Sequence, residues 1–249
     1  RLAFVVNHAM AKLQDTFLML IITFFLSLSE LRNPIRYFPF TMADEINFFQ
    51  SKFFQRFVGT FSLIPIDRTV DGKMKAKNIL EECKKRWMEY SAVSLIGNIE
   101  GGRTESAASW ITSAKGSKLG EPTRGIAVLT LETNTPMIPC WGRTINVPYR
   151  KFSPPALFWK LFEWIFRKEW QKIGFYDARP KACPKIVLWG LLEIGLNPGI
   201  KVYIDINHPQ GPVRPRVGEE NSRQLTRRYS EALLSLGDYQ LDRIQKGRK

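Results

Sequence analysis

The chain has 249 residues, of which 44% are hydrophobic, and it carries 37 Lys and Arg against 23 Asp and Glu, for a formal net charge of +14. This length fits one large domain or two small ones, and the composition is that of an ordinary globular protein with enough apolar residues for a core. The charge favours partners that carry phosphate. The basic residues are scattered among apolar and aromatic ones, with no zinc-finger spacing, recognition-helix pattern or aromatic-basic RNA-binding signature. An anionic membrane is therefore favoured over nucleic acid.

The predicted strands are short apolar runs, and amphipathic stretches separate them. The expected strands cover residues 2–6, 61–66, 92–96, 137–141 and 202–206. Helices are expected from Gln14 up to the break at Asn33-Pro34, and over residues 46–58, 76–87, 124–132, 156–172 and 224–236. Pro65 confines the second strand to a sheet edge or a strand end. This order predicts an α/β fold, a mixed central sheet covered by helices, in a single domain spanning residues 1–249.

Two apolar helices raise the question of membrane contact. The run from Phe17 to Leu28 has 12 residues, fewer than the roughly 20 that span a bilayer, so we interpret it as a buried or interfacial helix. The Trp-rich segment 156–172 suits either an interfacial helix or a core helix. Association with the cytoplasmic face of a membrane is the expectation. Because the sequence begins at Arg1, already close to an apolar strand, we also expect that an N-terminal segment is missing.

Cysteines and histidines limit the chemistry that the chain can perform. Cys83, Cys140 and Cys183 are widely spaced and form no CxxC pair, which indicates reduced, buried thiols. The only histidines, His8 and His208, lie far apart without Cys or carboxylate neighbours at a metal-ligand spacing. We therefore expect no metal and no cofactor, and we place His208 in a loop.

The first predicted strand delivers a histidine to its carboxyl end. Asn7-His8 follows the strand, and Asp15 is the first carboxylate after His8. An imidazole oriented by a carboxylate can take a proton from a hydroxyl group. Taken alone, the pair also fits a simpler interpretation in which His8 caps the next helix or bonds to backbone.

Two later strand ends carry arginines. Asp67-Arg68 ends the second strand, and Glu100-Gly101-Gly102-Arg103-Thr104 follows the third. Exposed backbone N–H groups at glycines and two converging guanidinium groups can hold a phosphate dianion. An ordinary glycine turn beside solvated surface arginines is the alternative.

In order along the chain, these blocks and Pro136-Met137-Ile138-Pro139 resemble the four motif blocks of the glycerophospholipid acyltransferase superfamily, and the lysophosphatidic acid acyltransferase (PlsC-type) branch fits best. The resemblance covers about residues 3–145 and leaves residues 150–249 to C-terminal helices and the last strand. It implies an O-acyltransferase of phospholipid biosynthesis. The donor would be an acyl thioester, either acyl-CoA or acyl-carrier protein, and the acceptor a lysophospholipid at a membrane surface.

The resemblance also implies the role of each matching residue. His8 would be the general base on the acceptor hydroxyl, and Asp15 would orient it. Arg68 and Arg103 would hold the phosphate in a pocket shaped by Glu100, Gly101 and Gly102. No serine or cysteine nucleophile lies in the matching blocks, so the alcohol would attack the thioester carbonyl directly.

The first block departs from the family pattern. The family has four residues between His and Asp, whereas six separate His8 from Asp15. A continuous helix over residues 8–15 would hold the two about 10 Å apart along its axis, beyond hydrogen bonding. We therefore predict that residues 9–13 form a looped entry that brings Asp15 to His8 Nδ1.

The third block departs as well, with Gly102 in place of the usual Thr and Asn98-Ile99 in place of Phe-Pro. This change bears on acceptor selectivity. Two alternatives to catalysis stay open: a catalytically impaired, acyltransferase-like protein that only binds phospholipid, and a basic nucleic-acid-binding protein.

Overall fold

The computed structural model describes residues 2–7, 39–44, 63–66, 80–85, 87–88, 94–100, 109–145 and 201–247. The helices expected before residue 34, over 46–58 and over 156–172 lie outside these ranges, as does Cys183.

The main element is a six-stranded sheet with the order β3-β2-β4-β1-β7-β8. Its strands are β1 (Leu2–Val6), β2 (Pro39–Asp44), β3 (Leu63–Ile66), β4 (Ser94–Asn98), β7 (Met137–Ile145) and β8 (Lys201–Ile206). All neighbouring pairs are parallel except β7 and β8, which are antiparallel. The expectation of a mixed sheet in an α/β fold is therefore confirmed.

The centre of this sheet is its most apolar part. In β1, Ala3 and Val5 are fully buried, and Phe4 and Val6 are almost so. A parallel strand covered on both faces needs such an uninterrupted apolar run, which explains the LAFVV sequence. Pro65 lies in β3 at the edge of the sheet, as expected of a residue that lacks an N–H for a ladder.

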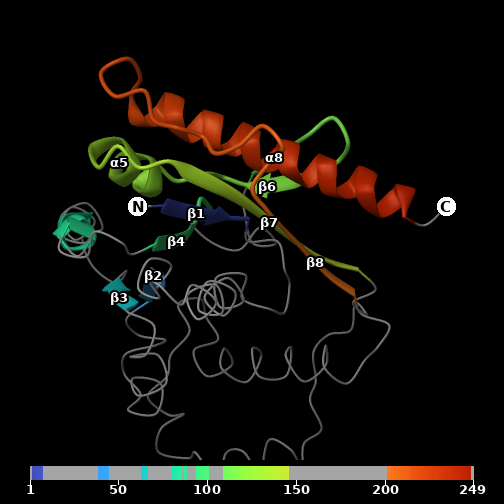
Figure 1. The fold of residues 1–249 in the computed structure, drawn as a ribbon, viewed down its shortest axis with the longest axis horizontal. Coiled ribbons are helices and arrows are strands. Elements are labelled where there is room, and N and C mark those ends of the chain that lie inside the picture. The colour runs from blue at the N-terminus through green and yellow to red at the C-terminus, as the bar shows by residue number, and fades with distance from the viewer. Residues whose placement is uncertain are drawn as a thin grey trace, which may run out of the picture.

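Two helices, α5 (Gly125–Glu132) and α8 (Ser222–Lys246), pack against each other and cover one face of the sheet (Figure 1). The core-facing side of α8 presents fully buried side chains at Leu225, Tyr229, Leu233 and Leu236. This spacing of three and four residues is that of a helix with one apolar face. The core therefore lies between the sheet and these two helices.

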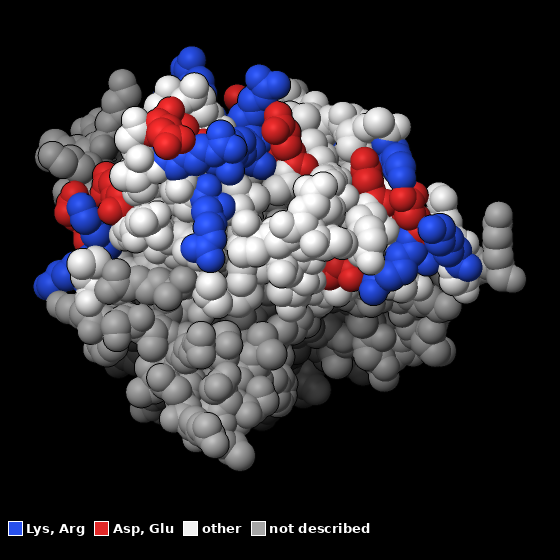
Figure 2. Space-filling view, turned by 45° about the horizontal axis from the view of Figure 1, so that its top comes forward, with Lys and Arg blue, Asp and Glu red and all other residues white. Residues whose placement is uncertain are grey.

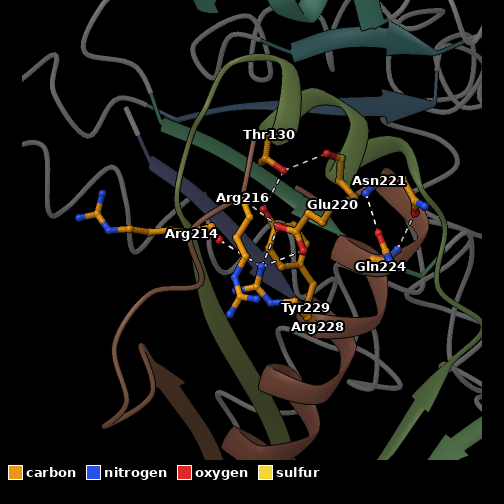
Figure 3. A network of polar contacts seen from close by, with 9 residues as sticks. Thr130, Arg214, Arg216, Glu220, Asn221, Gln224, Arg228 and Tyr229 are labelled. Atoms are coloured by element: carbon orange, nitrogen blue, oxygen red, sulfur yellow. Dashed lines mark hydrogen bonds and ion pairs between the residues drawn. The ribbon is translucent and has the colours of Figure 1, made fainter. Parts of the chain in front are cut away.

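The start of α8 is fixed by polar contacts (Figure 3). Asn221 forms a capping box with Gln224, which satisfies N–H groups that the first helical turn leaves without partners. Beside it, Arg228 Nη1 donates to both carboxylate oxygens of Glu220, at 2.7 and 2.9 Å. In the core, the Tyr229 hydroxyl donates to Thr130 Oγ1 at 2.7 Å, which ties α8 to α5.

Several elements differ from the expectation. The strand expected over 92–96 lies at 94–98, β7 continues beyond residue 141 to Ile145, and α8 continues beyond residue 236 to Lys246. Strand β2 and the hairpin of β5 (Trp110–Thr112) and β6 (Lys118–Gly120) were not expected. Residues 80–85 and 87–88 are helical, in agreement with the helix predicted over 76–87, and α5 begins one residue after its expected start.

The face that carries α8 has mixed charges. Figure 2 shows blue and red side chains next to one another there, with uncharged surface between the groups. Exposed ion pairs account for part of this mixing, for example Arg227 with Glu231 at 2.9 Å. None of the helices within the described part of the chain is long and apolar enough to cross a membrane.

Candidate functional site

The candidate site lies at the carboxyl edge of the parallel strands. The register aligns Val6 of β1 with Asn98 of β4, and Asp44 of β2 with Ile66 of β3. Neighbouring strands are about 4.8 Å apart, so the end of β3 lies three spacings, about 14 Å, from the end of β1. The backbone thus brings the ends of β1, β4 and β3 to one edge of the sheet.

Most of the predicted site residues directly follow these strand ends. His8, Asp15, Arg68, Gly101, Gly102 and Arg103 lie outside the described residues. Their neighbours Asn7, Ile66 and Glu100 are described. The contact between His8 and Asp15, and the loop over residues 9–13, stay predictions.

Asn7 fixes the position from which the chain leaves β1. Its side chain is fully buried and makes a two-way contact with the backbone of Gly142 in β7. Nδ2 donates to the Gly142 carbonyl oxygen at 3.0 Å, and the Gly142 N–H donates to Oδ1 at 2.8 Å. Because both backbone groups would otherwise lack these partners in the interior, Asn7 is held in one orientation.

Glu100 has a corresponding role after β4. Its side chain is 5% exposed, and its Oε1 accepts a hydrogen bond from the Gly120 N–H of β6. The backbone of Glu100 also forms an isolated bridge with Pro122. The described hydrogen bond of this carboxylate therefore connects the end of β4 to β6. Its role in a phosphate pocket stays a prediction.

The segment 101–108 begins and ends beside the same piece of chain. Glu100, before it, is bonded to Gly120, and Ser109, after it, has its Oγ 3.5 Å from Glu121 Oε2. Thr123 adds two hydrogen bonds to the Ile99 carbonyl oxygen, 2.7 Å from its N–H and 3.0 Å from its hydroxyl. The described residues before and after the segment 101–108 therefore both contact the segment around β6.

His208 lies in a loop after β8, as predicted. Its Nδ1 accepts a hydrogen bond from the Gln210 N–H at 3.1 Å, and its Nε2 lies 3.2 Å from the Ser235 hydroxyl. Since Nδ1 acts as the acceptor, the neutral ring carries its proton on Nε2 and donates to Ser235. His208 in this state cannot act as a base toward that serine. Partial burial lowers the pKa of His208.

The two described cysteines, Cys83 and Cys140, are buried thiols, as predicted. Burial raises the pKa of the Cys140 thiol strongly, and a backbone hydrogen bond from Asn207 offsets this only in part. A thiol in that state is a poor nucleophile. Within the described ranges there is no group of three His, Cys, Asp or Glu side chains that could hold a metal ion.

Comparison with models of protein families gives no match, and comparison with curated proteins gives none either.

The sequence indicated Asn7 only as the neighbour of His8 and did not predict its hydrogen bonds with the backbone of Gly142. A polar residue directly after an uninterrupted apolar strand was the available signal. The contact of Glu100 with Gly120 had no signal in the sequence, because it joins residues 20 positions apart through a hairpin that was not predicted.

Proposed function

We propose that this protein transfers a fatty acyl group from an acyl thioester to a hydroxyl of a phosphate-bearing glycerolipid, with His8 as the general base. The observation that carries the proposal is the parallel register of β1, β4, β2 and β3. It brings the three strand ends that precede His8, Arg68 and Gly101 to one edge of the sheet. In α/β folds, ligands bind at that edge.

The spacing of these strand ends suits a small phospholipid precursor. About 14 Å separates the backbone ends of β1 and β3, and arginine side chains are long enough to shorten such a gap toward a shared phosphate. The chemistry needs a base near the hydroxyl and cations near the phosphate. In the sequence, a histidine and two arginines follow the strand ends at this edge, which meets this need.

The described residues that flank the third block support the same function. Glu100, before the segment 101–108, and Ser109, after it, both contact the segment around β6. Fixed flanking residues lower the entropy cost of ordering a binding segment around an anionic ligand. The buried Asn7 restricts the exit of the chain from β1 in the same way.

The experiment is a thiol-release assay with the purified protein, an acyl-CoA and lysophosphatidic acid. We expect turnover by the wild type and a loss of about 10²- to 10⁴-fold in His8→Ala, the usual effect of removing a general base. His208→Ala is the matched control, because it removes the other histidine, which hydrogen-bonds in a loop. His8→Ala as active as the control would refute the assigned base.

The arginines require a separate readout. We expect Arg68→Ala and Arg103→Ala to raise KM for the lysophospholipid more than they lower kcat, because they would act on the bound phosphate. Arg223→Ala, which changes an exposed arginine in the first turn of α8, is the control. If neither the wild type nor His8→Ala releases thiol while both bind lysophosphatidic acid, the protein is the phospholipid-binding alternative.

A further inference from the structure

The pairing of β1 with both of its neighbours stops at Val6. Val6 lies opposite Asn98 of β4 on one side and opposite Cys140 of β7 on the other, and these are the last positions of the two ladders. Strand β7 itself continues to Ile145, where it pairs with β8. Beyond Cys140, the side of β7 that faces β1 therefore has no strand paired with it in the described part of the chain.

The side chain of Asn7 takes the place of the missing strand. Its amide donates to the carbonyl oxygen of Gly142 and accepts from the N–H of the same residue, at 3.0 and 2.8 Å. Two residues that form a hydrogen-bonded pair in an antiparallel ladder exchange the same two bonds through their backbones. Because a side chain makes this exchange here, the backbone that follows Asn7 is not required for pairing with β7.

Among side chains of this size, only asparagine suits both bonds. Asn7 is fully buried, so a side chain that lost one of the two bonds would leave a backbone group of Gly142 without a partner in the interior. An aspartate would accept from the N–H but would set an ionised oxygen against the carbonyl oxygen, and a leucine would make neither bond. The contact therefore holds the end of β1 in one arrangement.

The residue that follows Asn7 is the proposed base. One planar peptide bond joins Asn7 to His8, so the place of the His8 backbone nitrogen depends directly on Asn7. A general base has to lie within hydrogen-bonding distance of the hydroxyl that it deprotonates, and a displacement of about 1 Å can cost about 10²-fold in rate. The proposed arginines follow other strands, β3 and β4, so a change at Asn7 should affect the base more than the phosphate.

We propose that Asn7 is a positioning residue for the reaction, which acts by fixing the end of β1 from which the chain continues to His8. This proposal rests on the proposed function, because it takes His8 as the base. It adds a requirement for asparagine at position 7. It also makes Gly142 of β7 part of the support of the site, although β7 contributes none of the proposed site residues.

The first test compares kcat and KM of the whole chain in the thiol-release assay with acyl-CoA and lysophosphatidic acid. We expect Asn7→Leu and Asn7→Asp to lower kcat by about 10- to 10²-fold, with KM for lysophosphatidic acid within about twofold of the wild-type value. Tyr229→Phe is the control, because it removes another buried hydrogen bond, the one between α8 and Thr130 of α5. If Asn7→Leu does not fold, Asn7→Asp, which keeps one of the two bonds, decides the outcome.

The second test does not depend on catalysis. The chain has only two histidines, so proton NMR of the imidazole rings gives two titration curves, and His8→Ala identifies the curve of His8. We expect the titration midpoint of His8 to move in the Asn7 variants, because the ring would be displaced from its predicted partner Asp15. The midpoint should stay unchanged in Tyr229→Phe, and the curve of His208 should stay unchanged in every variant.

The two measurements separate failure of this proposal from failure of the proposed function. A wild type that releases no thiol, with a His8 curve that moves only in the Asn7 variants, supports the positioning of His8 by Asn7 and refutes the acyltransferase. An unchanged His8 curve in the Asn7 variants would overturn the positioning role, even if the wild type is active. Loss of kcat to the same extent in Tyr229→Phe would overturn it too, since the effect would then follow from lower stability alone.

Discussion

At the scale of single residues, the candidate site depends on buried polar side chains that bond to backbone. Asn7 holds β1 to β7, and Glu100 holds β4 to β6. Neither side chain needs to touch a substrate to matter, because each fixes the point at which the chain leaves the sheet toward a predicted site residue. Such residues affect activity through position.

Glu100 allows a matched pair of substitutions. In Glu100→Gln an oxygen can still accept the Gly120 hydrogen bond, whereas Glu100→Ala leaves that buried N–H without it. We expect Glu100→Ala to lower the free energy of unfolding by about 2 kcal/mol, and Glu100→Gln by less than half as much. Urea denaturation measures both. Equal losses in the two variants would show that the charge, and not the acceptor, holds the hairpin.

His208 predicts a dependence of stability on pH. Partial burial lowers its pKa in the folded protein below the ordinary value, so the unfolded chain binds the proton more readily. Its contribution to the free energy of unfolding is therefore fully present above about pH 6.5. This contribution is lost as pH falls through the pKa that His208 has in the folded protein. Protonation also removes the acceptor for the Gln210 N–H.

Thermal unfolding at pH 7.5 and pH 5.5 checks this prediction. We expect the Tm of the wild type to fall further between pH 7.5 and pH 5.5 than the Tm of His208→Gln, because the variant has no group that titrates at this position. A larger loss in His208→Gln would contradict the sign of the pKa shift.

At the scale of elements, the contact between α8 and β7 determines how closely this helix approaches the sheet. A Cβ added at Gly237 would lie 2.6 Å from Trp141 Cε2 and 2.8 Å from Ser117 Oγ. The residue is therefore glycine because the indole ring of β7 occupies the space where a side chain would begin. This close approach is a packing requirement within a long helix.

Replacing Gly237 by alanine should destabilise the protein, which is the opposite of the usual effect of this substitution inside a helix. Glycine to alanine inside a helix normally adds stability of about 1 kcal/mol, but Gly237→Ala should cost about 1–3 kcal/mol because the buried ring must move. Gly125→Ala, at the start of α5 with nothing within 4 Å of the added Cβ, should be neutral or slightly stabilising. Thermal unfolding of the two variants compares them, and a Gly237→Ala protein as stable as Gly125→Ala would refute the packing argument.

At the scale of the whole molecule, the C-terminal part of the chain completes the core of the N-terminal part. The motif blocks end near residue 145, but Leu225, Tyr229, Leu233 and Leu236 of α8 belong to the same core cluster as β1, β4 and β7. Strand β8 also pairs with β7 over six residue positions. The motif region therefore has no complete core of its own.

A chain that ends at residue 200 should accordingly fail to fold. Burial of the four apolar side chains of α8 contributes on the order of 10 kcal/mol, which is comparable with the total stability of a typical domain, about 5–15 kcal/mol. We expect strong binding of a hydrophobic dye and no cooperative thermal transition in circular dichroism. A cooperative transition like that of the full chain would show that the motif region folds independently.

The sequence by itself determined the elements whose signal is local. The apolar run of β1, the proline of β3 at a sheet edge, the apolar stretch of α5 and the start of α8 are each encoded by neighbouring residues, and the alternation of strands and helices is enough to predict a mixed α/β sheet. The end of α8 was missed because its last turns are mostly polar: Gln240 is fully buried, and it forms hydrogen bonds with Trp141 and Arg143 of β7. No local pattern predicts a buried glutamine.

The tertiary structure alone decided which strand ends meet and what holds them. The order β3-β2-β4-β1-β7-β8, the contact of Asn7 with Gly142 and that of Glu100 with Gly120 join residues far apart in the chain. Hairpin β5–β6 was missed for the same reason, since it has only three residues in each strand and its burial comes from α8. Periodicity reports which face of an element is apolar, whereas the partner of that face is chosen by packing across the whole chain.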